Sequence, residues 1–564
     1  MSPMNRSFAS AATLGPAVVV AGLVFGLYAL TMPTVLPATG DARAQTAETL
    51  EYAIELKPHH LLVTPADRLA VAVAQRLGFR APAFVPIQVL NALAGATACG
   101  LFLLWLGRLG VSLPVAVPYA LALACSYGHW LHSREAEAGI LANLFLLVAL
   151  NLRPLTAPRS TPVLFPAVFA ALSILCALNT AALMPGLALL DAVEAERRAR
   201  WRGMLGFLIA TAAMTGAAFL VLPWVAWGTG PRALIEKVTT HPSMVHMTEQ
   251  GEVTLANALR AVSGLVNAFT GDSAVATALK ERLRGDAPVP VSSGDWVRFG
   301  LGALIVAVLA LRLLDRPRDA RERVLWLATW AALVPTALFN FFWLGSDPQF
   351  WLPVLPFLGA WSAVRSMRAV RLRRTGKSPL VPEALVPAAA AFALAIANFP
   401  TSVPTLLSRN GGLEWQQSRS FAEQAGPLDL LFYAGSWGTY LPRSGTTSTV
   451  NLVYALPPGK EKYRQALLDT IDGALDRGGR VFALGIFGEP TATGTGAWDE
   501  IRAISGRGQE DWVRELRTRY DLSPAEPPIF GDLWQIRART SGTTHPEGRQ
   551  GSTKIRRGRS RAAA

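Results

Sequence analysis

An acidic segment follows the first apolar stretch of the chain and contains the residues best suited to general-base chemistry. It includes Asp41, Glu48 and Glu55. If the segment is helical, these three carboxylates recur every seven residues and share one face. Asp41 comes directly after the apolar stretch, where partial desolvation would make a carboxylate a stronger base. The residues alone favour a plainer interpretation, a solvated amphipathic helix that lies on a membrane surface.

A second acidic cluster contains Arg134, Glu135 and Glu137, immediately before another apolar run. Glu137 is followed by Ala-Gly-Ile-Leu-Ala, so we expect it to project toward the membrane. A carboxylate at that place is costly unless it faces a polar cavity, which makes Glu137 a candidate functional residue. The alternative is a helix N-terminus that carries acids, and this explains Glu135 better than Glu137.

Two adjacent histidines, His59 and His60, end the first acidic segment. Neighbouring residues on a regular element point in different directions, and no metal-ligand spacing surrounds the pair. One histidine is suited to donate to a phosphate while the other packs; a purely structural role for both is equally favoured. Cys99, Cys125 and Cys176 fall in apolar stretches without metal-binding spacing. The sequence therefore assigns no cofactor and leaves open whether a divalent metal assists.

The elements that position these residues are predicted to be membrane-spanning helices. The chain of 564 residues is 51% hydrophobic and 16% charged, with a mean hydropathy of +0.31. A soluble protein of this size carries about a quarter of its residues as charged side chains. Apolar runs of bilayer length predict about eleven crossings. These are 15–35, 84–106, 114–131, 135–152, 163–178, 181–192, 204–227, 299–314, 324–343, 350–364 and 380–399, the fifth and sixth as a re-entrant pair hinged at Asn179.

Arginine-rich loops orient the predicted helices. Three such loops fall on one face in this topology, and the positive-inside rule identifies that face as cytoplasmic. The sequence therefore predicts a bacterial-type cytoplasmic (inner) membrane protein with its N-terminus inside. The loops 36–82 and 228–298 and all residues after Pro400 are then outside. The arginine-rich loops contain Arg197, Arg198, Arg200 and Arg202; Arg312, Arg316, Arg318, Arg321 and Arg323; and Arg365, Arg368, Arg371, Arg373 and Arg374.

Composition divides the chain into three predicted parts. Residues 1–400 form the membrane domain, and residues 401–540 form a small extracytoplasmic α/β domain. Within it, 429–434 and 480–484 have the pattern of buried strands and 460–476 that of an amphipathic helix. Residues 541–564 form a disordered basic tail. The net charge of +14 is concentrated in membrane loops and in this tail, so nucleic acid is not an expected partner.

The order of these features resembles the GT-C class of membrane glycosyltransferases, in particular the branch related to protein O-mannosyltransferases. Gly40-Asp41 follows the first span, and Glu137 begins the fourth. A Leu-Asn179-Thr-Ala-Ala-Leu-Met-Pro break comes next, and then an Asp347-Pro-x-x-Trp351-x-Pro-x-x-Pro turn. Taken alone, the aromatic-rich turn around Trp351 favours a belt at the membrane interface. The resemblance covers about two thirds of the chain and rests on the order of its motifs.

The resemblance implies an enzyme that transfers a sugar from a polyprenyl-phosphate carrier to a protein or glycolipid acceptor at the outer face. It implies Asp41 as the general base and Glu137 as a second carboxylate. The segment from Lys57 to His60 replaces a family segment that holds the donor phosphate, but it lacks the glycine and the tyrosine of that segment. Candidate substrate-binding residues are Arg43, Lys57, His59, His60, Arg134, Glu135 and Asn179.

Two other classes of function stay open at this stage. The first is a transporter or flippase of glycans or lipids, and the second is a non-catalytic scaffold in the membrane. Transporters usually have inverted repeats and ionisable residues near the middle of a span. This sequence shows no internal repeat and places its acids at the ends of spans, which disfavours transport.

Overall fold

The structure is a computed structural model that describes most of the helical body and the core of a C-terminal sheet. The described ranges are 3–33, 60–79, 84–152, 164–190, 197–227, 254–271, 290–342, 347–374, 385–399, 428–433, 448–452, 460–484, 505–525 and 533–539, with isolated residues between them.

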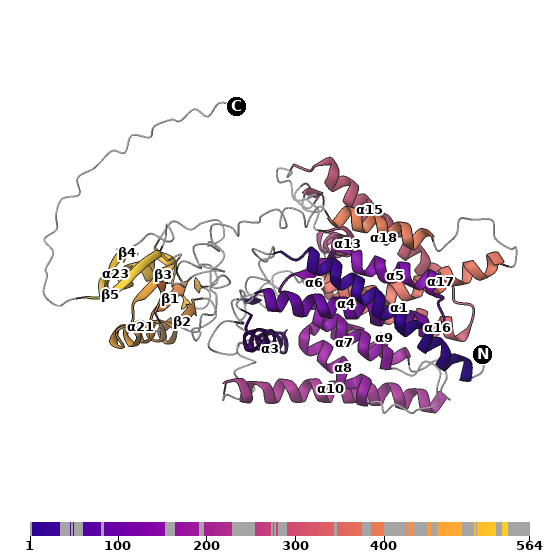
Figure 1. Cartoon of the computed structure of the whole chain (residues 1–564), viewed down its shortest axis with the longest axis horizontal. Helices are drawn as coiled ribbons and strands as arrows, with labels where there is room; N and C mark the ends of the chain where they lie inside the picture. Colours follow the sequence, from indigo (N-terminus) through magenta and orange to yellow (C-terminus); the bar gives the residue numbers. More distant parts are fainter. Residues whose placement is uncertain are drawn as a thin grey trace.

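A bundle of apolar helices forms the larger part of the molecule (Figure 1). Within the described ranges, five helices are long and apolar enough to cross a membrane, so the chain is a multi-pass membrane protein. The expectation of about eleven crossings is supported only roughly, because the other apolar helices in the described ranges are shorter or broken. The five are α1 (Pro3–Leu30), α4 (Phe84–Arg108), α10 (Arg197–Trp227), α15 (Ser293–Leu314) and α16 (Ala320–Phe342).

The shorter elements fill the space between the long helices. α6 (Tyr127–Arg134) and α7 (Gly139–Leu152) together are long enough for a sixth crossing, but they are bent by 111° relative to each other. The remaining elements of the body are α3 (Val63–Arg76), α5 (Leu113–Cys125), α8 (Leu164–Cys176), η1 (Leu178–Leu183), α9 (Met184–Leu189), α13 (Leu255–Thr270), η3 (Pro348–Val354), α17 (Leu355–Arg374) and α18 (Leu385–Asn398).

Several predicted spans have different bounds in the structure, and two of these differences adjoin α6. The span expected over 114–131 is interrupted at Ser126, whose backbone is extended, so α5 and α6 are separate helices. The helix expected to begin at Glu135 begins at Gly139, because residues 135–138 form the turn between α6 and α7. The predicted outer loop 228–298 also contains α13, which packs against α6, η3 and α15.

Helix α4 is the central element of the body. It packs against α1, α3, α5, α6, α7 and α17, and its side chains Phe102 and Trp105 are buried with Phe357 of α17. Small residues allow the close approach of helices that membrane packing requires. A Cβ at Gly100, for example, would lie 2.9 Å from the Ala17 carbonyl oxygen of α1.

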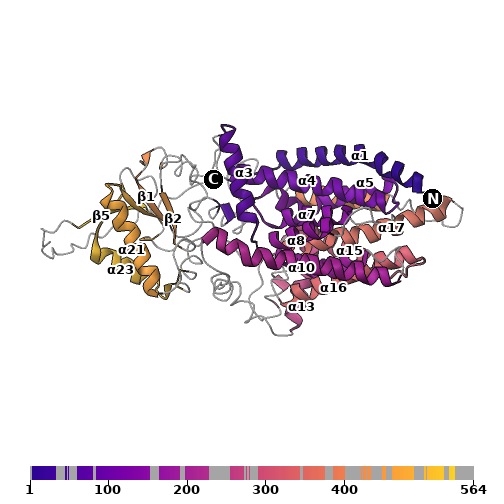
Figure 2. The same cartoon turned by 90° about the horizontal axis from the view of Figure 1, so that it is seen from below.

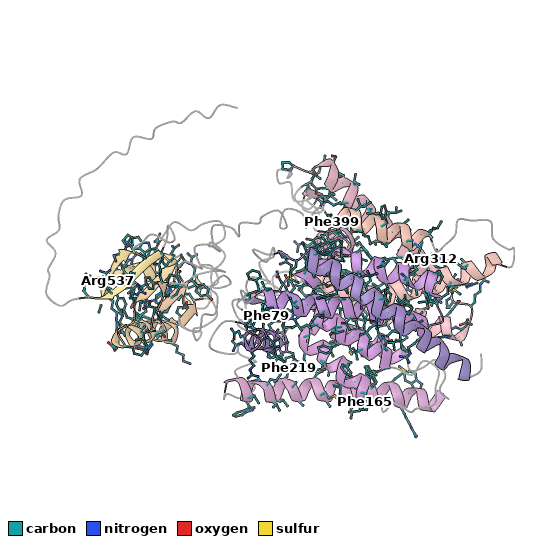
Figure 3. The ribbon with its side chains drawn as sticks, viewed as in Figure 1. Phe79, Phe165, Phe219, Arg312, Phe399 and Arg537 are labelled. Atoms are coloured by element: carbon teal, nitrogen blue, oxygen red, sulfur yellow. The ribbon has the colours of Figure 1, made fainter. Side chains whose placement is uncertain are left out.

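The helical body has two distinct ends. α3 lies at the end nearest the C-terminal sheet, whereas the N-terminus and the last turns of α17 lie at the opposite end (Figures 1 and 2). Figure 3 shows Phe79, just after α3, and Arg312 toward opposite ends. At the arginine-rich end, Arg365 lies 3.2 Å from Asp315 and 3.5 Å from Glu322, which fastens α17 to the turn between α15 and α16.

The C-terminal region folds around a five-stranded sheet with strand order β2-β1-β3-β5-β4. β1 pairs in parallel with β2 and β3, whereas β5 pairs antiparallel with β3 and β4. The two predicted strands and the predicted helix are confirmed as β1, β3 and α21. The elements are β1 (Leu430–Tyr433), β2 (Ser448–Asn451), α21 (Lys460–Asp476), β3 (Val481–Leu484), α23 (Gln509–Arg519), β4 (Tyr520–Pro524) and β5 (Leu533–Ala538).

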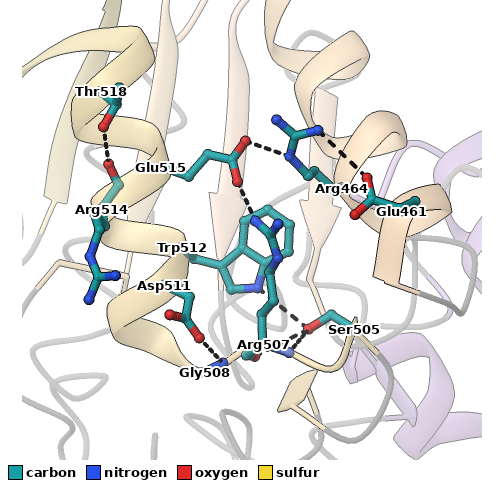
Figure 4. A network of polar contacts seen from close by, with 10 residues as sticks. All are labelled: Glu461, Arg464, Ser505, Arg507, Gly508, Asp511, Trp512, Arg514, Glu515 and Thr518. Carbon is teal, nitrogen blue, oxygen red and sulfur yellow. Dashed lines mark hydrogen bonds and ion pairs between the residues drawn. The ribbon is translucent and has the colours of Figure 1, made fainter.

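Polar contacts join the two helices of this region (Figure 4). Glu515 of α23 accepts from Arg464 Nε of α21 at 2.6 Å, and its other oxygen accepts from Arg507. The guanidinium of Arg507 also lies over the ring of Trp512, with its Cζ 5.4 Å from the ring centre. Beneath these contacts the buried side chains of Tyr463, Trp512 and their neighbours form the core.

Candidate active site

The turn between α6 and α7 is the polar centre of the helical body. Asn91 of α4 donates from Nδ2 to the carbonyl oxygens of Glu135 at 2.7 Å and Glu137 at 2.8 Å. The side chain of Asn91 is fully buried. Backbone groups outside regular helices must find partners when they lie within a membrane domain. A single amide from α4 therefore satisfies two carbonyl groups of this turn.

Both carboxylates of the second acidic cluster are buried at this turn. Glu135 is 0% exposed and Glu137 is 5% exposed. His132 of α6 faces Glu137, with Nδ1 of the imidazole 3.8 Å from Oε2 of the carboxylate. A carboxylate and an imidazole at this separation form an ion pair when the histidine is protonated, so the pair is suited to hold or move a proton.

A buried arginine lies next to the carboxylates. The side chain of Arg134 is 3% exposed, and its NH1 donates to the Thr31 carbonyl oxygen at 3.2 Å. Thr31 follows α1, and its hydroxyl also accepts from Trp130 Nε1 at 3.0 Å. A guanidinium in such a desolvated place is suited to bind a phosphate or a carboxylate. The cluster thus combines two acids and one cation at the end of α1.

Part of the first predicted outer loop covers the turn. His60 donates from Nδ1 to the Cys176 carbonyl oxygen at 2.7 Å, and it interacts electrostatically with His132. Gln45 is buried and donates to the Asp67 carboxylate of α3 at 2.9 Å. Ala136, in the turn itself, packs with side chains of α3 and α4, namely Val71 and Ile87.

The short helix η3 lies on the other side of the turn. It packs against α6, α7 and η1, and a Cβ at Gly139 would lie 3.5 Å from Leu352 Cδ1. Trp351 is 3% exposed, so the expectation that it belongs to an interfacial belt is wrong. Neighbouring helices surround η3, which removes its aromatic side chain from lipid. Asn179 Nδ2 donates to the Phe350 carbonyl oxygen at 3.4 Å.

The structure brings together part of the predicted site. Arg134, Glu135, Glu137 and His60 lie around the turn, and Asn179 reaches it indirectly through its contact with η3. The other predicted residues lie outside the described residues, so their placement stays a prediction. These are the candidate base Asp41 and the candidate substrate-binding residues Arg43, Lys57 and His59.

Sequence reasoning did not assign a role to Asn91 or His132. The signal for Asn91 was a polar residue within an otherwise apolar span, where such residues are rare and often functional. Its span also contains Gln88, another fully buried amide. The signal for His132 was its place in the same short motif as Arg134 and Glu137.

The described residues offer no ready-made metal centre. Among them, no group of three or more His, Cys, Asp or Glu side chains is arranged to hold a metal ion. Cys99, Cys125 and Cys176 are separate and buried.

Comparison with known proteins adds information on the fold. No protein-family model matches this chain, and no curated protein resembles it significantly in sequence. The solved structures include ArnT from Cupriavidus metallidurans bound to undecaprenyl phosphate. It is 13% identical, with a TM-score of 0.52 over 92% of this chain and 97% of that chain. The chain therefore has the fold of a GT-C membrane protein, which confirms the resemblance identified from the sequence at the level of fold.

Two more distant structures belong to the same class. The Pmt1-Pmt2 protein O-mannosyltransferase of S. cerevisiae, bound to its sugar donor, is 14% identical, with a TM-score of 0.31 over 40% of this chain. This chain covers 34% of the yeast chain. An oligosaccharyltransferase from Archaeoglobus fulgidus is 11% identical, with a TM-score of 0.40 over 84% of this chain and 69% of that chain.

Proposed function

We propose that this protein is a glycosyltransferase that moves a sugar from a polyprenyl-phosphate carrier to a protein or lipid acceptor. The observation that carries the proposal is the buried turn around Glu137. It combines a carboxylate, a histidine 3.8 Å away and a buried arginine in a chain with the GT-C fold. Acid, base and phosphate-binding groups are the groups that this transfer requires.

In the proposed reaction, Asp41 accepts the proton of an acceptor hydroxyl as its oxygen attacks the anomeric carbon of the sugar. The bond between that carbon and the phosphate oxygen breaks, and polyprenyl phosphate leaves with the bonding electrons. Glu137 accepts a hydrogen bond from the reacting sugar or acceptor and orients it.

Cationic and hydrogen-bonding groups stabilise the departing phosphate in this proposal. Arg134 is the described member of the set, and its guanidinium is already desolvated. Arg43, Lys57 and His59 are assigned the same task from the sequence. A preorganised cation stabilises negative charge most strongly where water is excluded.

The proposal includes an orientation in the membrane and a division into domains. The arginine-rich end of the body faces the cytoplasm, and α3, the turn around Glu137 and the C-terminal sheet face the exterior or periplasm. Residues 1–400 form the transferase domain, residues 401–540 the extracytoplasmic domain and residues 541–564 a basic tail. The membrane is of the bacterial inner-membrane type.

Transfer of radiolabel from polyprenyl-phosphate sugars in purified membranes tests the proposal. Wild-type protein is compared with Asp41→Asn and Glu137→Gln, and Glu461→Gln is the control because that carboxylate is 73% exposed and remote from the turn. We expect transfer by wild type and control, and a loss of on the order of 100-fold or more in both site variants. Transfer that is unchanged in Asp41→Asn and Glu137→Gln would refute the assigned site. A folded wild-type protein that transfers no sugar would refute the function.

A further inference from the structure

We propose that Asn91 is a positioning residue that holds the turn between α6 and α7 so that Glu137 faces His132. The catalytic part of this inference rests on the proposed function. Its structural part rests on the two hydrogen bonds from Asn91 Nδ2 to the Glu135 and Glu137 carbonyl oxygens. These oxygens flank Ala136, so one amide spans the middle of the turn.

The turn needs such a partner because of its place in the fold. Residues 135–138 join two helices that are bent by 111°, so the helical pattern of hydrogen bonds is interrupted there. The turn is buried between α3, α4 and η3, and its side chains Glu135 and Ala136 are fully buried. An unpaired carbonyl in such surroundings is costly, because no water replaces the lost bond. Asn91 donates to two carbonyl oxygens of this turn.

Close packing of α4 and α6 allows the short side chain of Asn91 to reach the turn. Gly95 is one helical turn beyond Asn91 on the same side of α4, and a Cβ there would lie 2.0 Å from Ser133 Oγ of α6. Ser133 lies between His132 and Arg134. The approach at Gly95 and the hydrogen bonds of Asn91 thus fix the end of α6 and the turn that follows it.

Fixing the backbone at Glu137 fixes the direction of its side chain. The carboxylate is 3.8 Å from His132 Nδ1, and the neighbouring Ala136 packs against Val71 and Ile87. A rotation of this turn would carry Glu137 away from His132. Loss of geometry on the order of 1 Å costs an enzyme about 100-fold in rate.

Asn398 provides a matched control within the same chain. Its Nδ2 donates to the carbonyl oxygens of Cys125 and Phe269, each at 2.8 Å, and its side chain is 1% exposed. It therefore makes the same kind of double hydrogen bond in an equally buried place. Its partners belong to the ends of α5 and α13, so its loss leaves the contacts of residues 135–138 in place.

The first experiment measures the turn directly. Asn91→Leu and Asn398→Leu each keep the branched skeleton of four heavy side-chain atoms and remove the donors. Hydrogen–deuterium exchange is measured on full-length protein in lipid nanodiscs, with peptides that cover 131–142 and 122–130. We expect Asn91→Leu to accelerate exchange in 131–142 by about 10-fold or more, and Asn398→Leu to leave that segment unchanged. Equal exchange in 131–142 for wild type and Asn91→Leu would overturn the inference.

The second experiment measures transfer kinetics with the same three proteins. We expect Asn91→Leu to lower kcat by on the order of 100-fold with little change in KM, because the substrate still binds but Glu137 is misplaced. Asn398→Leu is expected to lose far less activity at equal thermal stability. Equal losses in the two variants would show a general structural effect and overturn the positioning role. Absence of transfer by wild type would instead refute the proposed function. Hydrogen–deuterium exchange would then still test whether Asn91 stabilises the turn between α6 and α7.

Discussion

Gly95 and Ser133 lie so close together that a Cβ at position 95 would come within 2.0 Å of Ser133 Oγ and 2.7 Å of Ser133 Cβ. We predict that Gly95→Ala lowers the stability of the helical body by about 1–3 kcal/mol, because α6 must move away from α4. Gly22→Ala in α1 is the control, since nothing lies within 4 Å of a Cβ there. Thermal unfolding in detergent measures both. A Gly95→Ala protein as stable as Gly22→Ala would contradict the close packing of α4 and α6.

Tyr28 joins α1 to the break between α5 and α6. Its hydroxyl donates to the Ala124 carbonyl oxygen at 2.9 Å, and His129 Nδ1 lies 2.9 Å from the Tyr28 hydroxyl oxygen. We predict that Tyr28→Phe lowers stability by about 1–2 kcal/mol, because two buried polar groups lose a partner. In the control Tyr119→Phe, the lost contact joins a half-buried tyrosine hydroxyl to Ser366 Oγ at 3.0 Å, so a smaller loss is expected. Equal melting temperatures for wild type and Tyr28→Phe would count against this role.

Asp429 makes the C-terminal sheet sensitive to acid. Burial alone raises the pKa of this carboxyl, but hydrogen bonds from Arg480 and Gly426 and the charge of Arg480 together lower the pKa below its ordinary value. The unfolded chain has a pKa of about 3.9 for Asp. Since the folded-state pKa is lower, the stabilisation is fully present above the unfolded-state pKa. It is lost as the pH falls from there through the folded-state pKa.

We therefore predict that Asp429→Asn lowers the unfolding temperature of the sheet at pH 7, and that the difference from wild type shrinks below about pH 3.9. Calorimetry of the full chain in detergent, at pH 7 and again below about pH 3.9, measures the difference in unfolding temperature. Asp521→Asn is the control, because that side chain is 54% exposed and lies 3.8 Å from Arg539 Nε. A difference from wild type that persists unchanged at low pH would contradict the assignment to Asp429.

Glu515 links α21 to α23 through Arg464 and Arg507. We predict that Glu515→Gln destabilises the C-terminal sheet by about 1 kcal/mol or more, because its side chain is 15% exposed and two guanidinium groups lose their shared carboxylate. Glu461→Gln removes a contact at 3.7 Å from a 73% exposed carboxylate, so we expect almost no effect. Equal destabilisation by the two variants in urea titrations would show that the burial of Glu515 contributes nothing to the stability of the C-terminal sheet.

Local patterns predicted those parts of the fold that depend on nearby residues. The buried strands β1 and β3 and the helix α21 follow from short apolar runs and a helical repeat, so their bounds agree with the sequence analysis within one or two residues. The same holds for the long helix α4, whereas α1 begins at Pro3 and ends at Leu30, well before the predicted bounds of 15–35. Each of these elements buries a face that its own sequence defines.

The breaks in the helical body depend on distant residues and were missed for that reason. Residues 135–138 leave the helix where Asn91 supplies donors, and 44 residues separate Asn91 from Glu135. The interruption at Ser126 contains neither glycine nor proline, the usual local signals for a break. Trp351 looked like an interfacial residue because no local pattern reveals that six other elements surround η3, among them α6, α7, α13 and α16.

The unequal burial of the long helices also has an evolutionary consequence. In α4, 67% of the apolar segment is buried against protein, whereas in α10 and α15 the share is 11%. A residue that faces lipid must be apolar but need not match the shape of a neighbour, so α10 and α15 are free to drift among apolar side chains. α4 is held to fixed volumes at most of its positions. Homologous chains should therefore diverge fastest in sequence in α10 and α15 and retain the most sequence similarity in α4.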